Sequence, residues 1–198
     1  MIEEQQTLAL GAFKHIVVPV GVVIGLGVAR IVMMVSQYVA QHQRIRFSAI
    51  HGLWSVLLFV MLIGVWWIIW GLSHVQTERW SFFVVLYLVV GPILIYLPSI
   101  LLLPDVPAEG SLDLGGRFDR FGIVVLLCMA AFILWLACTE LYLLREPFWI
   151  PKRANQTVLC ASFLVGAAFP SRRMAGVVGS VALAAIFFSF ATLRTPLG

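Results

Sequence analysis

Charge is what this sequence lacks most. Only 11% of its 198 residues are charged and 62% are hydrophobic, which gives a mean hydropathy of +1.02. A soluble domain carries about 25% charged residues. A chain with so little charge cannot cover a surface that faces water, so a soluble helical bundle is excluded. The length suits a single domain over residues 1–198.

Cysteines and catalytic motifs are also scarce. The three cysteines, Cys128, Cys138 and Cys160, lie inside apolar runs without the spacing of a zinc site or of covalent haem attachment. The sequence has no HExxH motif, no nucleophile elbow and no phosphate-binding glycine loop. We therefore expect no cofactor, no metal ion and no catalytic residue. The sequence favours a non-catalytic protein over an enzyme.

What the chain does contain is six long apolar runs separated by short charged links. About 20 apolar residues in a helix cross the roughly 30 Å hydrocarbon core of a bilayer. Lipid offers no hydrogen bonds to the backbone, so each span must be helical. The sequence predicts an all-α, polytopic transmembrane bundle of six helices. Their expected ranges are 16–40, 47–73, 80–103, 121–143, 154–170 and 174–193.

The fifth run and the N-terminus each lead to a further expectation. The fifth run is short, so it either spans the membrane or forms a re-entrant or strongly tilted segment. The N-terminus, MIEEQQ, is acidic and lacks the basic start of a secretory signal, so the first helix should stay in the protein.

The basic residues flank the apolar runs, a pattern that orients membrane helices and argues against nucleic acid as a partner. Six spans place both termini on one side, here side A, with the links near 74–79 and 144–153. Side B holds the links near 41–46, 104–120 and 171–173. Arg30 aside, each side has six basic residues. The basic links QHQRIR and SRR break this tie and favour side B as cytoplasmic, with the termini on the periplasmic side.

Tryptophans gather at the side A ends and links. They are Trp66, Trp67, Trp70, Trp80 and Trp149. An interfacial aromatic belt explains them, because indole combines an apolar body with one polar N–H. An aromatic-lined ligand mouth is the alternative.

Arg30 is the sharpest candidate site residue, because it lies near the middle of the first apolar run. An arginine at the centre of a membrane helix costs about 2.5–3.5 kcal/mol, so it should face protein or water. Gly27, Met34, Gln37 and Gln41 share its helix face, and Ser48, His51 and Ser55 form a matching stripe on the second helix. The expected intramembrane polar cluster comprises Arg30, Gln37, His51, Ser55 and Asp119.

Asp113 or Asp119 is the expected counter-charge of Arg30, and Asp119 is also placed to cap the fourth helix. Two interpretations of Arg30 stay open. It is either a structural residue in a buried hydrogen-bond network, or part of a site for an anion, a lipid head group or a proton.

Glu140, near the side A end of the fourth helix, is the second candidate. His15 and His74 lie at a similar depth, so a carboxylate–histidine proton relay is one interpretation. An interfacial carboxylate that reaches head groups or pairs with Arg145 is the other. His15 and His74 are poor candidates for axial haem ligands, since no second helix pair repeats their arrangement.

Small residues mark where helices can approach closely in lipid. Gly21 and Gly25 form a GxxxG pair, and Gly176, Ser180 and Ala184 form a ridge; these faces serve either the bundle or a contact between protomers. Gly91-Pro92 predicts a kink in the third helix.

The order of motifs GLGVAR at 25–30, QRIR at 43–46, Trp66-Trp67 and Glu78-Arg79-Trp80 resembles a group of small bacterial multi-pass membrane proteins. The likeness covers roughly residues 20–105. It implies a bacterial plasma-membrane location, and that group has no assigned activity from which a substrate or site could be inferred.

Three functions follow as hypotheses. The first is a non-catalytic accessory or scaffold protein that acts by helix association, with the lipid bilayer and either a second copy or another membrane protein as partners. The second is a small channel or transporter for protons or a small anion through the Arg30 region. The third is a membrane-embedded enzyme acting on lipid or quinone.

Overall fold

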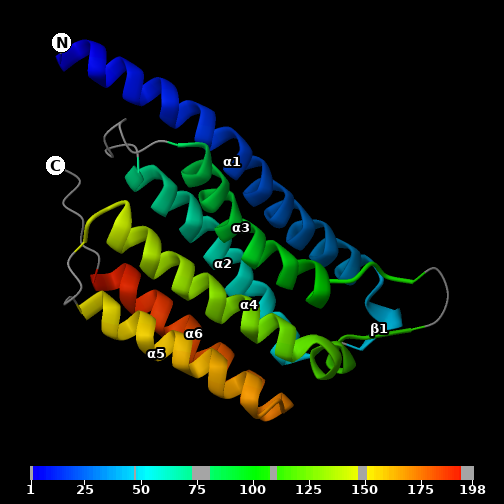
Figure 1. Cartoon of the computed structure of the whole chain (residues 1–198). Coiled ribbons are helices and arrows are strands. Elements are labelled where there is room, and N and C mark those ends of the chain that lie inside the picture. Colours follow the sequence, from blue (N-terminus) through cyan, green and yellow to red (C-terminus); the bar gives the residue numbers. More distant parts are fainter. Residues whose placement is uncertain (1, 47, 73–80, 108–110, 147–150, 193–198) are drawn as a thin grey trace.

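The structure, a computed structural model, describes residues 2–46, 48–72, 81–107, 111–146 and 151–192, without the side chains of 2–16, 151 and 190–192. Its helices confirm the expected all-α bundle (Figure 1). They are α1 (Ile2–Ala40), α2 (Ala49–Gly71), α3 (Phe82–Leu102), α4 (Leu114–Tyr142), α5 (Pro151–Ala168) and α6 (Arg172–Thr192).

Five of these helices are long and apolar enough to cross a membrane, and α5 is not among them. With 18 residues, α5 is about 27 Å long, slightly less than the hydrocarbon core. Its first two turns carry Lys152, Arg153, Asn155 and Gln156. These side chains explain why α5 falls below the hydropathy of the other helices.

The helices are arranged with α1 along one side of the bundle and α5 and α6 along the other (Figure 1). Helix α1 packs on α2 and α3, whereas α5 packs on α4 and α6. Helices α2 and α4 contribute most to the core, with 44% of each span buried against 28% for α1 and 22% for α6. Many large apolar side chains along these helices are exposed, as expected for helices that face lipid.

Helix α4 begins at Leu114, seven residues before the expected start at 121. The glycines of the long link suggested a loop, but Asp113 caps the helix instead, since its Oδ1 accepts a hydrogen bond from Gly115 N at 3.0 Å. The expectation that Asp119 caps this helix is therefore wrong. Helix α1 also starts earlier than expected, at Ile2, because the helix continues through the polar N-terminal residues.

The side B links pair with each other. After α1, a 3-10 turn at His42–Arg44 leads into β1 (Ile45–Arg46), which pairs in parallel with β2 (Leu112–Asp113). This two-residue pairing lies between helices, so it is compatible with the exclusion of isolated strands from lipid. It attaches the first hairpin link to the start of α4.

Helices α2 and α6 contact each other closely at their side B ends. A Cβ added to Gly179 would lie 2.9 Å from the Leu53 side chain, and one added to Gly176 would lie 3.8 Å from Ile50. Trp54 Nε1 donates to the carbonyl oxygen of Ala175 at 3.2 Å. The small-residue ridge of α6 thus serves the bundle at Gly176, whereas Ser180 and Ala184 are exposed.

Candidate functional site

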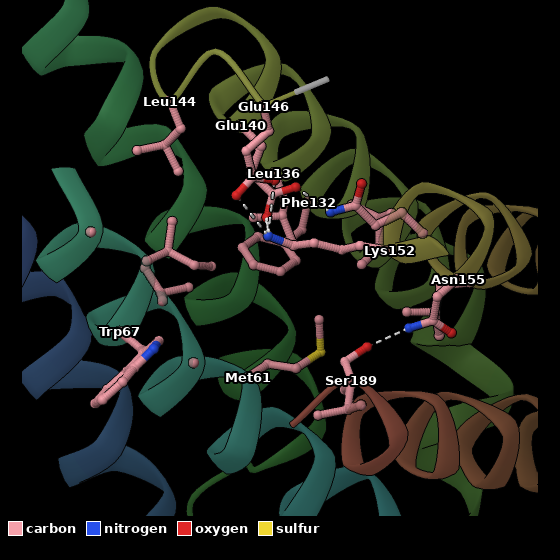
Figure 2. A pocket seen from close by; sticks show the side chains of 18 of the residues that line it. Met61, Trp67, Phe132, Leu136, Glu140, Leu144, Glu146, Lys152, Asn155 and Ser189 are labelled. Atoms are coloured by element: carbon pink, nitrogen blue, oxygen red, sulfur yellow. Dashed lines mark hydrogen bonds and ion pairs between the residues drawn. The ribbon is translucent and has the colours of Figure 1, made fainter. Parts of the chain in front are cut away.

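A cavity of about 320 Å³ lies at the side A end, between α2, α4, α5 and α6 (Figure 2). Its walls come from the second half of α2, from Val60 to Gly71, and from Ile186 and Ser189 of α6. These are the parts of α2 and α6 beyond their glycine-mediated contact. The wall is mostly apolar and includes Met61, Val65, Phe132, Ile133, Leu136 and Leu159.

The polar end of the cavity holds an ionic cluster, which we define as Glu140, Glu146, Lys152, Arg153 and Gln156. Glu140 is its centre, and only 2% of that side chain is exposed. Lys152 Nζ lies 2.6 Å from Glu140 Oε1. Arg153 Nη1 and Gln156 Nε2 donate to Glu140 Oε2 at 2.9 and 2.7 Å. Both carboxylate oxygens therefore have strong donors, as a buried charge requires.

The local sequence explains how this cluster forms. Lys152, Arg153 and Gln156 occupy the first two turns of α5, with Arg153 and Gln156 three residues apart on one helix face. Glu140 lies in the last turn of α4, against which α5 packs. Pro151 suits the first position of α5, since a proline needs no N–H donor there. The polar face of α5 thus turns toward α4.

Glu146 reaches the cluster through the turn that ends α4. Arg145 adopts the left-handed conformation, with φ of 53°, and Glu146 N then donates to the carbonyl oxygen of Glu140 at 3.0 Å. Lys152 Nζ lies 3.3 Å from Glu146 Oε2 and 3.4 Å from Glu146 Oε1. The Glu146 side chain is 31% exposed, so it forms the outer and looser contact of the lysine.

The charges of the cluster balance, with two carboxylates against one ammonium and one guanidinium. Such a buried network is stable only while each charge keeps its partner. Arg153 also donates from Nη1 to Gln156 Oε1 at 2.7 Å, whereas its buried Nε and Nη2 have no hydrogen-bond partner among the described residues.

Asn155 adds a polar contact at the α5–α6 wall of the cavity. Its Nδ2 donates to Ser189 Oγ at 2.6 Å (Figure 2). It also donates to the carbonyl oxygen of Ala185 at 3.2 Å. These bonds fix the distance between the two helices beside the ionic cluster.

Arg30 lies at the other end of the bundle, where α3 ends. Its Nη1 lies 2.9 Å from Asp105 Oδ1, and its Nη2 donates to the carbonyl oxygen of Leu103 at 2.8 Å. Leu103 is the C-cap residue of α3. A cation at a helix C-terminus satisfies a free carbonyl and complements the helix dipole. These contacts join α1 to the end of α3.

The expected counter-charges of Arg30 were wrong. Asp113 caps α4, and Asp119 binds Arg172, with 2.6 Å between Asp119 Oδ2 and Arg172 Nη2. The partner is Asp105 because the segment that follows α3 continues along α1 toward the C-terminal end of that helix. The hydroxyl of Tyr38 holds this segment by donating to the carbonyl oxygen of Pro104 at 3.0 Å.

The remaining members of the expected intramembrane cluster have no described hydrogen bond with Arg30. His51 is buried, its ring centroid lies 6.1 Å from that of Tyr38, and its Nε2 has no described partner. Ser55 Oγ donates to the carbonyl oxygen of His51 within α2 at 2.9 Å. Gln37 is half-buried on α1. The polar faces of α1 and α2 meet in the described ring contact between Tyr38 and His51. The sequence pattern did not indicate this pair.

Glu140 stays a candidate site residue, and its partners differ from those expected. It binds Lys152 and Arg153 rather than Arg145, and it is buried rather than interfacial. The side chain of His15 and all of His74 lie outside the described residues. The sequence analysis began the fifth helix at residue 154. If the helix is begun at 151, Lys152, Asn155 and Gln156 fall at spacings of three and four and predict a polar helix face.

The aromatic side chains at side A are exposed where the structure describes them. Trp66, Trp67 and Trp70 are among the exposed residues, with Phe82 and Phe83 at the start of α3. Trp67 also lines the cavity, so the belt and the ligand-mouth interpretations share this residue. Trp80 and Trp149 lie outside the described residues.

Comparison of the chain with protein-family models, curated proteins and solved structures gave no match. The cavity and its ionic cluster are therefore interpreted from their geometry and chemistry.

Proposed function

We propose that this chain is a non-catalytic multi-pass membrane protein that binds a small amphiphile in the cavity between α2 and α6. The observation that carries the proposal is a cavity of about 320 Å³ with an apolar wall and hydrogen-bonding groups at one end. Ligand sites in proteins are mostly apolar, have a few polar groups that orient the ligand, and occupy about 300–1,000 Å³. The location within the spans suits a ligand dissolved in the bilayer.

The chemistry of the cluster supports binding over catalysis. Glu140 has both oxygens engaged by charged or amide donors, so it is poorly placed to remove a proton from a substrate. These contacts favour a site that orients a ligand without changing it.

The position of Arg30 makes transport the less favoured alternative. Its hydrogen bonds to Leu103 and Asp105 provide a structural reason for a charge within the span. If Arg30 instead formed an ion pathway, Arg30→Leu would abolish flux in liposomes while the bundle stayed folded. Unchanged flux in that variant would remove Arg30 from any transport mechanism.

The accessory role inferred from the sequence is compatible with this site. A membrane protein that holds an amphiphile without converting it would present that ligand to a second protein or to another copy of itself. We place it in the bacterial plasma membrane on the strength of the motif resemblance.

The structure also supplies an argument for the orientation. Lys152 and Arg153, which the sequence assigned to a side A link, bind buried Glu140 within α5. If Lys152 and Arg153 are left out of the count of basic residues in the links and termini, side A has four and side B has six. The positive-inside rule then favours side B as cytoplasmic.

Photoreactive amphiphiles test the proposed function. A long-chain alcohol and a fatty acid of the same length, each with a diazirine, would be cross-linked to the protein in lipid nanodiscs. The cross-links would then be mapped by mass spectrometry. Leu136→Trp fills the cavity from α4, whereas Leu134→Trp, on the exposed face of the same helix, is the matched control.

We expect at least one probe to label cavity residues, and we expect this labelling to fall about tenfold in Leu136→Trp while Leu134→Trp retains it. Labelling that is unaffected by Leu136→Trp, or that is confined to lipid-exposed faces, would exclude the cavity as the binding site.

A further inference from the structure

We infer that the amphiphile carries a carboxylate head group and that this carboxylate exchanges with Glu146 on Lys152. The inference rests on the proposed function and specifies its ligand class. The ligand would be a fatty acid or a similar long-chain carboxylate, with its charged end at the ionic cluster and its chain along the apolar wall.

The two carboxylate contacts of Lys152 differ in strength. Nζ lies 2.6 Å from Glu140 Oε1 but 3.3 and 3.4 Å from the two oxygens of Glu146. A strong charge-assisted N–H···O bond measures about 2.7–2.9 Å, and contacts beyond 3.2 Å are weak. The ammonium is thus firmly bound on its inner side and loosely bound on its outer side, where it lines the cavity.

The cost of leaving the lysine also differs between the two carboxylates. Glu140 is held by Arg153 and Gln156 as well, and its side chain is only 2% exposed, so its release would strand a buried charge. Glu146 is 31% exposed, and Lys152 is its one described side-chain partner. Its carboxylate regains water when it leaves Lys152, so an incoming anion can take its place at small cost.

Charge balance selects the sign of the head group. A ligand carboxylate that replaces Glu146 leaves one anion beside the outer side of Lys152, so the cluster remains neutral. A cationic head group could bind only Glu146, since the oxygens of Glu140 are engaged, and it would add a positive charge to a neutral cluster beside Lys152. An uncharged head group that displaced Glu146 would leave Lys152 with an ion–dipole contact in place of an ion pair, and the cluster would gain a net positive charge.

The geometry of one lysine favours a carboxylate over a phosphate. Among the residues that the structure describes, Lys152 is the one basic side chain that lines the cavity, since Arg153 is directed to Glu140, Gln156 and Ala137. A phosphate monoester carries about 1.5–2 negative charges near neutral pH. A single ammonium shared with Glu140 cannot balance that charge in an apolar surrounding.

The test measures binding to the full-length protein in nanodiscs of zwitterionic lipid at pH 8. The ligands are three twelve-carbon amphiphiles: a carboxylate, an alcohol and an alkyl phosphate. Each competes for the photoreactive probe that labels the cavity. Glu146→Gln keeps the size of the side chain and removes the competing charge, Lys152→Met removes the ammonium, and Asp119→Asn is a control for an exposed carboxylate away from the cavity.

We expect the carboxylate to bind about tenfold more tightly than the alcohol and the phosphate, because it is the head group that keeps the cluster neutral. Glu146→Gln should tighten carboxylate binding several-fold and leave alcohol binding unchanged. Lys152→Met should remove the preference for the carboxylate, and Asp119→Asn should change neither. Thermal unfolding of each variant verifies that the bundle is intact, and Glu146→Gln alone decides the matter if Lys152→Met does not fold.

The outcomes separate this inference from the proposed function. If the alcohol or the phosphate binds in the cavity as tightly as the carboxylate, the inference is wrong and the proposed function stands. If Glu146→Gln weakens carboxylate binding, Glu146 contacts the ligand and does not exchange with it, which also overturns the inference. If no amphiphile competes for the cavity, the proposed function itself fails.

Discussion

Tyr87 of α3 and Trp135 of α4 exchange hydrogen bonds. The Tyr87 hydroxyl donates to the carbonyl oxygen of Trp135, and Trp135 Nε1 donates to the carbonyl oxygen of Tyr87, both at 2.9 Å. The indole lies directly over Gly91, where an added Cβ would be 2.5 Å from the ring atoms. Gly91 therefore provides the space that this reciprocal pair requires.

Gly91→Ala should destabilise the bundle by about 1–3 kcal/mol, since the new methyl group would displace the Trp135 ring and its hydrogen bonds. Thermal unfolding in detergent would detect the loss. Gly25→Ala is the control, because the added Cβ there meets no described side chain or neighbouring helix within 4 Å. Equal melting temperatures for the two variants would contradict the close packing of α3 on α4.

Glu140→Gln should be the most destabilising single charge change in the ionic cluster. It leaves Lys152 and Arg153 as neighbouring cations without their shared carboxylate, which costs about 3–5 kcal/mol for a buried pair. Asp119→Asn removes a carboxylate from an exposed pair with Arg172 and should leave the melting temperature nearly unchanged. If Glu140→Gln melts like the native protein, the cluster is not buried as described.

Arg30→Leu should destabilise the protein by about 1–3 kcal/mol, because the carbonyl at the end of α3 loses its charged donor. Asp105→Asn should cost at most about 1 kcal/mol, since the Asp105 side chain is 73% exposed and the bond from Arg30 to Leu103 remains. Chemical or thermal unfolding of both variants gives the comparison. A larger effect for Asp105→Asn would assign the stabilising role to the ion pair instead of the helix cap.

Arg145→Gly should preserve stability or raise it by up to about 1 kcal/mol, because glycine adopts the left-handed conformation without steric cost. Arg145→Val should lower stability, since a β-branched residue strongly disfavours positive φ. The two melting temperatures, measured side by side, test whether this turn positions Glu146. A less stable glycine variant would mean that the arginine side chain itself is required.

The helices were predictable because their signal is composition over about 20 residues, which the bilayer enforces. Their ends were less predictable because they depend on single contacts. Gly115 and Gly116 suggested a loop, yet the Asp113 cap and the approach of Arg172 place them in the first turn of α4. Arg172 Nη1 would lie only 3.2 Å from a Cβ at Gly115, a contact between helices that sequence spacing does not encode.

The candidate site was predictable only in part, for a related reason. An isolated ionisable residue in an apolar run is visible in the sequence, which is why Arg30 and Glu140 were both selected. Their partners were not visible. Asp105 follows a proline in a link, and Lys152 and Arg153 were counted as link charges because the start of α5 is polar. The cavity itself depends on how α2 and α6 diverge, which no local pattern records.

The orientation can be decided with two matched serines. Ser81 caps α3 on side A and Ser171 caps α6 on side B; both are exposed and accept a backbone N–H three residues later. Each would be changed to cysteine in a background whose native cysteines are replaced by alanine. Because the redistributed basic residues favour side B as cytoplasmic, a membrane-impermeant maleimide should label Ser81→Cys in intact cells. Ser171→Cys should be labelled only after the cells are permeabilised.

The reverse pattern would place side A in the cytoplasm, and it would show that Lys152 and Arg153 still act as topogenic charges before Glu140 binds them. Labelling of both cysteines in intact cells would mean that the chain inserts in both orientations, as the equal counts of basic residues in the sequence permit.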